Sequence, residues 1–226
     1  MGKHTMVLAD PAWQYNDRKA VRKDGGVARY GVGASGRYHT ESIEDMATIP
    51  VSDLASSRAH LYMWATWPFL KDALWLMNEW GFEYKTCAFV WIKTNRGRWK
   101  EGRGNLIRKL FAMGIEKFLD WMAFYGVGFY TASNTEFVLL GTRGQPHKPV
   151  KKASQVIFCP GWNSEDHSRK PDEVHRRIER MHPDATYAEL FARRQYPGWL
   201  CLGDELDGMD LRDSIPQMTF NLTERN

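Results

Sequence analysis

A short polar turn directly follows an apolar run near the start of the chain. Residues 6–9 are apolar, and Asp10-Pro11-Ala12-Trp13 comes next. The Asp10 carboxylate and the Pro11 carbonyl accept hydrogen bonds, and Trp13 offers an aromatic face for stacking. Two neighbouring acceptors suit the two hydrogens of an aromatic amine such as that of adenine, whose nitrogen then becomes tetrahedral and nucleophilic. An Asp-Pro turn is also common at strand ends, so the tetrapeptide alone leaves an ordinary turn as the alternative.

Two other motifs lack the context that their chemistry requires. Residues 31–36 read G-V-G-A-S-G, but this glycine pattern follows a basic loop and precedes no apolar helix, unlike a dinucleotide-binding turn. Residues 39–41 read H-T-E, half of a zinc deaminase signature, and the P-C-x-x-C half is missing. The seven histidines and three cysteines form no set with metal-ligand spacing. We therefore expect no nicotinamide or flavin cofactor and no metal.

Short apolar runs bounded by turn residues alternate with helical stretches, which is typical of an α/β sheet. In such sheets ligands bind beyond the carboxyl ends of the strands, where Asp10 to Trp13 would lie. We expect seven strands, at residues 6–9, 60–65, 87–92, 135–140, 155–158, 187–191 and 199–202.

Three helices are also expected from capping residues and apolar periodicity. The first covers residues 68–80, with Thr66 as its cap. The second begins at Pro171, and acidic residues follow in its first turn, where the helix dipole favours negative charge. The third covers residues 106–124 and is interrupted by Gly114.

Two basic insertions, at residues 14–38 and 96–127, break this alternation. The first is a long glycine-rich connection, and connections of this length in compact domains are usually functional or mobile. The second carries six basic residues between positions 96 and 109, with Trp99 among them, a mixture that suits a nucleic-acid backbone and its bases. A solvated surface loop is the alternative for either insertion. The candidate backbone contacts are Arg18, Lys19, Arg22, Lys23, Arg96, Arg98, Lys100 and Arg103.

Size and composition indicate one globular domain over residues 1–226. The net charge is only +4, so a nucleic-acid surface must come from local clustering of charge. The sequence has neither the features of a secretory signal nor an apolar stretch long enough to span a membrane. Cys87, Cys159 and Cys201 are widely spaced, which indicates reduced thiols and a cytoplasmic protein.

The turn Asp10-Pro11-Ala12-Trp13 resembles the D-P-P-[YFW] signature of amino-methyltransferases. The rest of the chain resembles the MT-A family of adenine methyltransferases, which includes the RNA N(6)-adenosine writers, from about Val7 to Asp210. The matching stretches lie in the same order as in the family, and several ordered motifs are more specific than one. They are residues 37–46, 91–95, 136–144, 167–173, 178–181, 189–193 and 199–208.

This resemblance implies a Rossmann-like seven-stranded, mostly parallel sheet with helices on both faces, in a single domain. It also implies S-adenosylmethionine as methyl donor, whose sulfonium makes the methyl group electrophilic without a metal. By resemblance, the turn Asp10-Pro11-Ala12-Trp13 holds the adenine, Tyr38 contacts the base, and Lys170 lies beside both base and donor. The donor site is then formed by Asp10, Lys170, Leu190, Phe191, Arg193, Gly203, Asp204 and Glu205.

The chain departs from the family pattern at two places. Ala12 replaces the second proline of the signature, which frees a backbone torsion at a cost of about 0.4 to 1 kcal/mol. Asp204-Glu205 stand where the RNA writers have amides, so these side chains accept hydrogen bonds and do not donate them.

The sequence therefore predicts an enzyme that methylates the exocyclic amine of adenine in a nucleic acid. DNA is favoured over RNA because no RNA-binding module accompanies the domain, and homodimers or heterodimers are both open. If about six basic groups neutralise phosphates, the logarithm of the DNA affinity falls against that of salt with a slope near −5. Two alternatives remain: an RNA adenine methyltransferase, and a non-catalytic nucleic-acid-binding partner that has lost turnover, as Ala12 allows.

Overall fold

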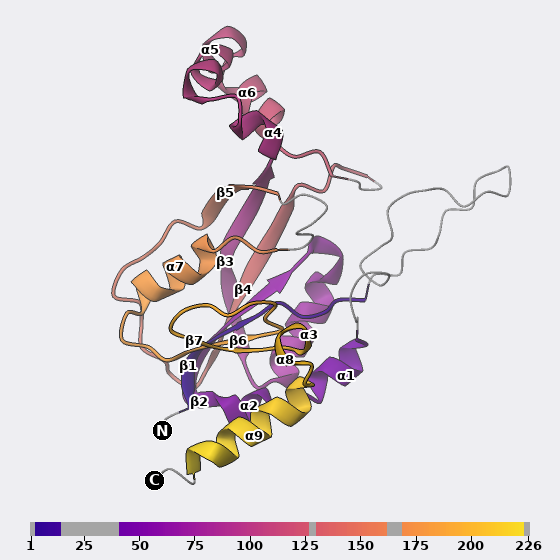
Figure 1. The fold of residues 1–226 in the computed structure, drawn as a ribbon, viewed down its shortest axis with the longest axis vertical. Helices are drawn as coiled ribbons and strands as arrows, with labels where there is room; N and C mark the ends of the chain where they lie inside the picture. The colour runs from indigo at the N-terminus through magenta and orange to yellow at the C-terminus, as the bar shows by residue number, and fades with distance from the viewer. Residues whose placement is uncertain (1–2, 15–40, 127–129, 162–168, 224–226) are drawn as a thin grey trace, which may run out of the picture. The chain divides into compact units, whose positions relative to one another are not determined.

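The computed structural model describes residues 3–14, 41–126, 130–161 and 169–223. Seven strands form one sheet in the order β5-β3-β4-β2-β1-β6-β7 (Figure 1). All seven predicted strands are present, and the Rossmann-like α/β fold is confirmed. They are β1 (His4–Ala9), β2 (Ala55–Ala65), β3 (Glu83–Thr94), β4 (Thr135–Arg143), β5 (Val156–Pro160), β6 (Tyr187–Leu190) and β7 (Trp199–Leu202).

The chain divides into two compact units, which are described separately. The first unit holds β1, β2, β6 and β7, and the second holds β5; β3 and β4 each run through both. The first comprises Met1–Lys85, Leu140–His147 and Thr186–Asn226, and the second Thr86–Leu139 and Lys148–Ala185. The organisation of residues 1–226 as a single domain stays a prediction.

In the first unit, β1 is a buried strand between β2 and β6, and it pairs with both in parallel. Val7, Leu8 and Ala9 are buried, which is why this strand reads as a continuous apolar run. Ala9 lies beside Leu190 of β6, and Leu190 lies beside Leu202 of β7, also in parallel. The carboxyl ends of β1, β6 and β7 therefore lie level with one another, at one edge of the sheet.

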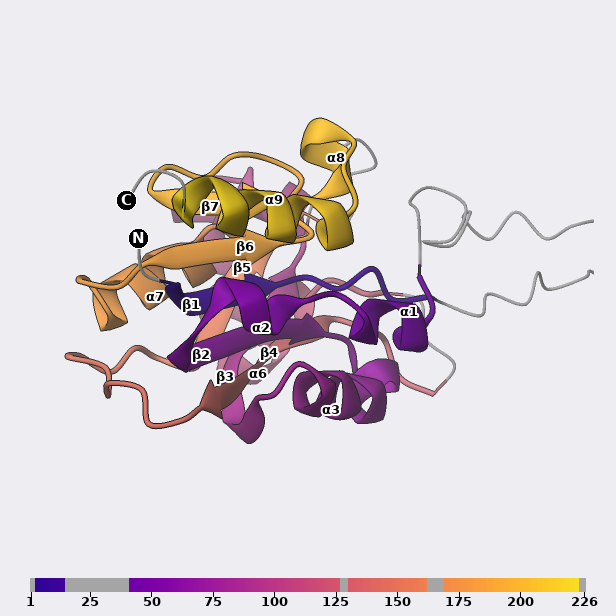
Figure 2. The same ribbon diagram turned by 90° about the horizontal axis from the view of Figure 1, so that it is seen from below.

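Short helices flank the strands of the first unit (Figure 2). The helix α3 packs against β2, and α9 packs against β7 and α2. Their bounds are α1 (Ile43–Ala47), α2 (Val51–Leu54), α3 (Leu70–Glu79), α8 (Asp204–Asp207) and α9 (Leu211–Thr223).

The predicted helix at residues 68–80 is confirmed, but its start differs. Its first turn is a 3-10 helix, Trp67–Phe69, before α3 begins. Thr66 occupies the N-cap position of this turn, as predicted, but its side chain makes no capping hydrogen bond. Its carbonyl instead accepts a hydrogen bond from the Phe69 N–H at 2.9 Å, the three-residue spacing of a 3-10 turn.

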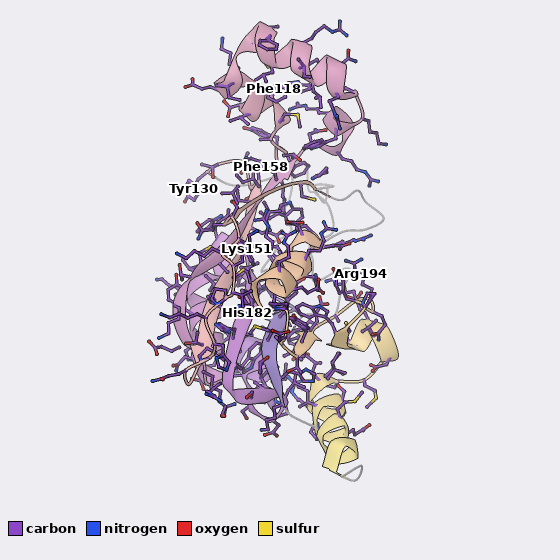
Figure 3. The ribbon with its side chains drawn as sticks, turned by 90° about the vertical axis from the view of Figure 1, so that its left-hand side faces the viewer. Phe118, Tyr130, Lys151, Phe158, His182 and Arg194 are labelled. Atoms are coloured by element: carbon purple, nitrogen blue, oxygen red, sulfur yellow. The ribbon has the colours of Figure 1, made fainter. Side chains whose placement is uncertain are left out.

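Among its described residues, the second unit carries the helices α4 (Arg96–Trp99), α5 (Arg103–Met113), α6 (Ile115–Met122) and α7 (Glu173–Met181). Gly114 divides α5 from α6 because it adopts φ 79° and ψ 163°, outside the helical region, and the predicted interruption at this glycine is confirmed. The two helices pack against each other, and Phe118 of α6, labelled in Figure 3, contacts the ring of Trp121. The basic stretch from position 96 is therefore largely helical and not an irregular loop.

The helix predicted to begin at Pro171 is present as α7, and it begins two residues later, at Glu173. In the part of the chain that the structure describes, no helix has the length and apolar character needed to cross a bilayer.

Candidate active site

The turn after β1 is fixed at its start by the backbone. The Asp10 N–H donates a hydrogen bond to the Leu190 carbonyl at 3.4 Å, which continues the pairing of β1 with β6 by one residue. The Pro11 carbonyl accepts a hydrogen bond from the Trp13 N–H at 2.8 Å. A carbonyl oxygen has two lone pairs, so one remains for a ligand. The turn thus has a carboxyl group and a peptide oxygen on neighbouring residues at the end of β1, and their role toward an amine stays a prediction.

The indole of Trp13 holds the end of this turn to the core. Trp13 is only 6% exposed, and its Nε1 donates a hydrogen bond to the Trp64 carbonyl at 3.2 Å. Its ring stacks on Phe69 with a centroid separation of 5.5 Å. The indole is therefore almost fully buried and packs the turn against the core, and a stacking role toward a base stays a prediction.

A second backbone contact holds the middle of the turn. The Glu41 N–H donates a hydrogen bond to the Ala12 carbonyl at 3.3 Å, and a parallel β-bridge pairs Glu41 with Trp13. Glu41 belongs to the rejected H-T-E motif and to the family-matching stretch 37–46, but its position beside the turn was not predicted. Nothing local in the sequence signals this contact.

The residues after β6 include a strained position. Phe191 has φ 59°, a left-handed conformation that costs an ordinary side chain about 1 kcal/mol or more. Its ring stacks with Trp80 at 6.4 Å, a contact that helps to hold it there. Leu190 is fully buried, so its side chain belongs to the core, and its contribution to a donor site stays a prediction.

The residues after β7 lie against those after β6. A Cβ on Gly203 would lie 2.4 Å from the Ala192 oxygen, so the two chain segments approach too closely for a side chain. Arg193 Nε lies 3.2 Å from Glu205 Oε1, and the Asp204 carboxylate accepts a hydrogen bond from the Glu205 N–H. The predicted donor residues of this unit are thus brought together around the ends of β1, β6 and β7.

The remaining donor candidate, Lys170, lies in the second unit within a charge cluster. Its Nζ is 3.4 Å from Glu136 Oε2, and Lys93 Nζ is 2.5 Å from the other oxygen of the same carboxylate. Desolvation raises the pKa of Glu136, but the charges and hydrogen bonds of Lys170 and Lys93 outweigh it and lower the pKa below its usual value. A lysine just before a helix opposes the helix dipole, and this ionised carboxylate explains why it is tolerated before α7.

Glu136 and Lys93 were not among the predicted site residues. Both belong to stretches that match the family, residues 91–95 and 136–144, which was the available signal. Their proximity to Lys170 depends on the fold of the second unit and could not be seen in the spacing.

The structure assigns internal contacts to part of the basic cluster at α4 and α5. Arg98 lies over the Trp121 ring at 4.7 Å, and Lys109 lies over the same ring at 4.2 Å and pairs with Glu101. The charged groups of Arg98 and Lys109 are therefore engaged in contacts within the protein. Arg103, in contrast, is exposed at the surface. Five other predicted residues, Arg18, Lys19, Arg22, Lys23 and Tyr38, lie outside the described residues.

Comparisons with known proteins show which family and relatives the chain resembles. The family described as MT-A70 matches residues 4–119 and 105–205. The type II methyltransferase M.MunI of Mycoplasma sp is 28% identical over 205 residues, covering 87% of this chain and 75% of that protein.

Longer eukaryotic proteins match over most of this chain. The N(6)-adenosine-methyltransferase catalytic subunit METTL3 of Homo sapiens is 25% identical over 215 residues, 94% of this chain and 30% of METTL3. The N(6)-adenosine-methyltransferase MT-A70-like protein of Arabidopsis thaliana is 24% identical over 213 residues, 93% of this chain and 25% of that protein. The chain therefore spans less than a third of these relatives. The family match covers most of the chain, and the chain belongs to the MT-A70 family, which confirms the resemblance that its motifs predicted.

Proposed function

We propose that the chain transfers a methyl group from S-adenosylmethionine to the exocyclic N6 of adenine in DNA. The observation that carries the proposal is the register of β1, β6 and β7, because it brings the acceptor turn at Asp10 and the charged residues after β6 and β7 to one edge of the sheet. The preference for DNA is supported by the identities: the type II methyltransferase is 28% identical to this chain, against 25% for METTL3.

The residues around these strand ends fit this donor. The guanidinium of Arg193 suits the carboxylate of the amino-acid part, and the carboxylates of Asp204 and Glu205 suit an ammonium or the ribose hydroxyls. Gly203 keeps this edge free of a side chain at a point of close backbone approach. When bound, the donor supplies a methyl group whose attachment to a sulfonium makes it electrophilic.

The work of the protein is to make a poor nucleophile attack. The Asp10 carboxylate and the free lone pair of the Pro11 carbonyl accept the two hydrogens of N6, which localises the nitrogen lone pair. The Asp10 carboxylate oxygen then receives one of these protons when the N–C bond has formed and the C–S bond has broken. Trp13 packs the turn against Phe69, and Tyr38 contacts the base, as the family resemblance implies.

The alternative of a non-catalytic partner rests on Ala12, which lacks the restraint of a proline ring. In the structure the Ala12 carbonyl accepts the hydrogen bond of Glu41, so the torsion that alanine frees is restrained by another contact. This favours a working catalytic turn.

Cys87, Cys159 and Cys201 are free thiols, which supports the proposal of a reducing, cytoplasmic location.

The test is methyl transfer from tritiated S-adenosylmethionine to duplex DNA, single-stranded DNA and RNA of defined sequence, with the modified nucleoside identified by mass spectrometry. Asp10→Asn keeps the shape of the side chain but removes its charge, and we expect a loss of about 100-fold or more in rate. Asp53→Asn, an exposed aspartate on α2, is the matched control and should retain the wild-type rate. Label that is equal in wild type and Asp10→Asn, or absent from both, would refute the catalytic assignment. Label in RNA alone would refute the DNA assignment.

A further inference from the structure

We infer that Arg212, on the C-terminal helix α9, positions the catalytic turn through its ion pair with Glu41. This inference rests on the proposed function, and it assigns a positioning role to Arg212, which lies outside the motifs, and to Glu41, which the motifs gave no role. Arg212 is 171 residues from Glu41 in the sequence, so only the fold joins them.

The guanidinium of Arg212 is held on every side. Its Nη2 donates to Glu41 Oε2 and to the Asp45 carbonyl, both at 2.6 Å. Its Nε donates to Thr48 Oγ1 at 2.7 Å, and its Nη1 bonds both carboxylate oxygens of Asp210 at 2.9 and 2.7 Å. All three guanidinium nitrogens are therefore used, which fixes the direction in which Arg212 holds Glu41.

Glu41 connects this arginine to the catalytic turn. Its side chain is 16% exposed and pairs with Arg212, while its backbone N–H donates to the Ala12 carbonyl at 3.3 Å. The same residue forms the β-bridge with Trp13. A displacement of Glu41 therefore acts directly on the Ala12–Trp13 peptide, whose N–H donates to the Pro11 carbonyl.

The departure from the family signature explains why such a restraint is needed. The turn is fixed at Asp10 by its bond to Leu190 and at Trp13 by its bond to Trp64. Between these points a second proline would fix φ, but this chain has Ala12. The contact from Glu41, held by Arg212, supplies a restraint that the missing proline ring would otherwise give.

The experiment compares Arg212→Met, which keeps the aliphatic stem, with Glu41→Gln, Arg212→Lys and the double variant R212M/E41Q. Arg176→Met is the matched control, because Arg176 is also an ion-paired helix residue, bound to Glu173 at 3.0 Å. Single-turnover methylation is measured at saturating donor and DNA, and donor affinity by calorimetry. Amide hydrogen exchange of the peptides that contain Trp13 and Glu41 reports the restraint itself.

We expect Arg212→Met to lower the single-turnover rate roughly tenfold to 100-fold, because a displacement of about 1 Å at a reacting group has effects of this size. The donor affinity should change less than the rate, because most of the proposed donor residues follow β6 and β7 and only Asp10 lies in the turn itself. Glu41→Gln should show a smaller loss, the double variant should be no slower than Arg212→Met alone, and Arg212→Lys should recover part of the rate. Exchange at the turn should be faster in Arg212→Met and unchanged in Arg176→Met.

Two outcomes overturn the inference: a wild-type rate in folded Arg212→Met, or an equal loss of rate in Arg176→Met. If Arg212→Met does not fold, Glu41→Gln carries the same test, because it removes the charge and keeps the shape. If the wild-type protein methylates no adenine, the proposed function fails, and hydrogen exchange alone decides the inference. Equal exchange at the turn in wild type and Glu41→Gln would then overturn it.

Discussion

Replacing Gly203 with alanine should deform the edge of the sheet where the donor residues lie. Gly203 has φ 168°, an extended conformation open to any residue, so the effect is steric and not conformational. An added Cβ would lie 2.4 Å from the Ala192 oxygen, 2.7 Å from its nitrogen and 3.1 Å from the Phe191 carbonyl carbon. These are backbone atoms, which cannot rotate away as a side chain would.

The size of the effect follows from these distances. Ordinary contact begins at 3.4 Å, so the segments must separate by 3.4 − 2.4, or about 1 Å. Overpacking of this kind costs about 1–3 kcal/mol of stability. The Ala192 N–H also donates to the Leu202 carbonyl at 2.9 Å, a bond between the ends of β6 and β7 that the movement would strain. The donor residues would shift with it.

Urea unfolding and donor calorimetry measure the two consequences separately. Gly203→Ala should unfold with about 1–3 kcal/mol less free energy and bind S-adenosylmethionine more weakly. The control is Gly104→Ala in α5, where an added Cβ meets no atom within 4 Å and alanine favours the helix, so its stability should rise by about 0.5–1 kcal/mol. An unfolding free energy and a donor affinity equal to wild type in Gly203→Ala would refute the steric argument.

Two further predictions concern charge. Desolvation raises the pKa of Glu173 on α7, but hydrogen bonds from Arg177, Arg180 and Arg176 outweigh it and lower the pKa from 4.5 to about 2. The lowered pKa stabilises the fold above pH 4.5, and this contribution is lost as the pH falls toward 2. Glu173→Gln should therefore cost about 1 kcal/mol at pH 7, allowing for solvent screening, and almost nothing near pH 2; a pH-independent difference in urea unfolding would contradict this. Arg103→Ala should reduce by about 1 the slope of log affinity against log salt for duplex DNA, measured by fluorescence anisotropy, and an unchanged slope would remove Arg103 from the DNA surface.

The strands could be predicted because their signals are local. β1 and its neighbours are buried parallel strands, so each reads as a short apolar run between turn residues. The break between α5 and α6 was likewise visible at Gly114. The helix α9 was not predicted, and it contains Pro216, which opposes a helix in its interior. Contacts with α2 and β7 hold it where local preference does not.

The same distinction applies to the site. Asp10 could be predicted because a polar residue directly after a buried strand falls at the ligand-binding edge of an α/β sheet. Glu136 could not, because a glutamate in a strand gives no sign that two lysines from elsewhere in the chain will share its carboxylate. Arg212 could not for a similar reason, since its partner Glu41 is 171 residues away.

What distinguishes the proposed catalytic turn is how its acceptors are fixed. An acceptor that must reorient during the reaction loses much of its advantage, whereas one held in advance requires no reorganisation. Here the restraints act mainly on the backbone: Asp10 through Leu190, Pro11 through the Trp13 N–H, and Ala12 through Glu41. The long side chain of Arg212 acts indirectly, through Glu41, and its guanidinium is itself fixed by hydrogen bonds from all three nitrogens. An alanine in place of the second proline is therefore tolerable only while the contact between Arg212 and Glu41 persists. The loss of Arg212 should lower the methylation rate more in this chain than in a variant in which Ala12 is replaced with proline.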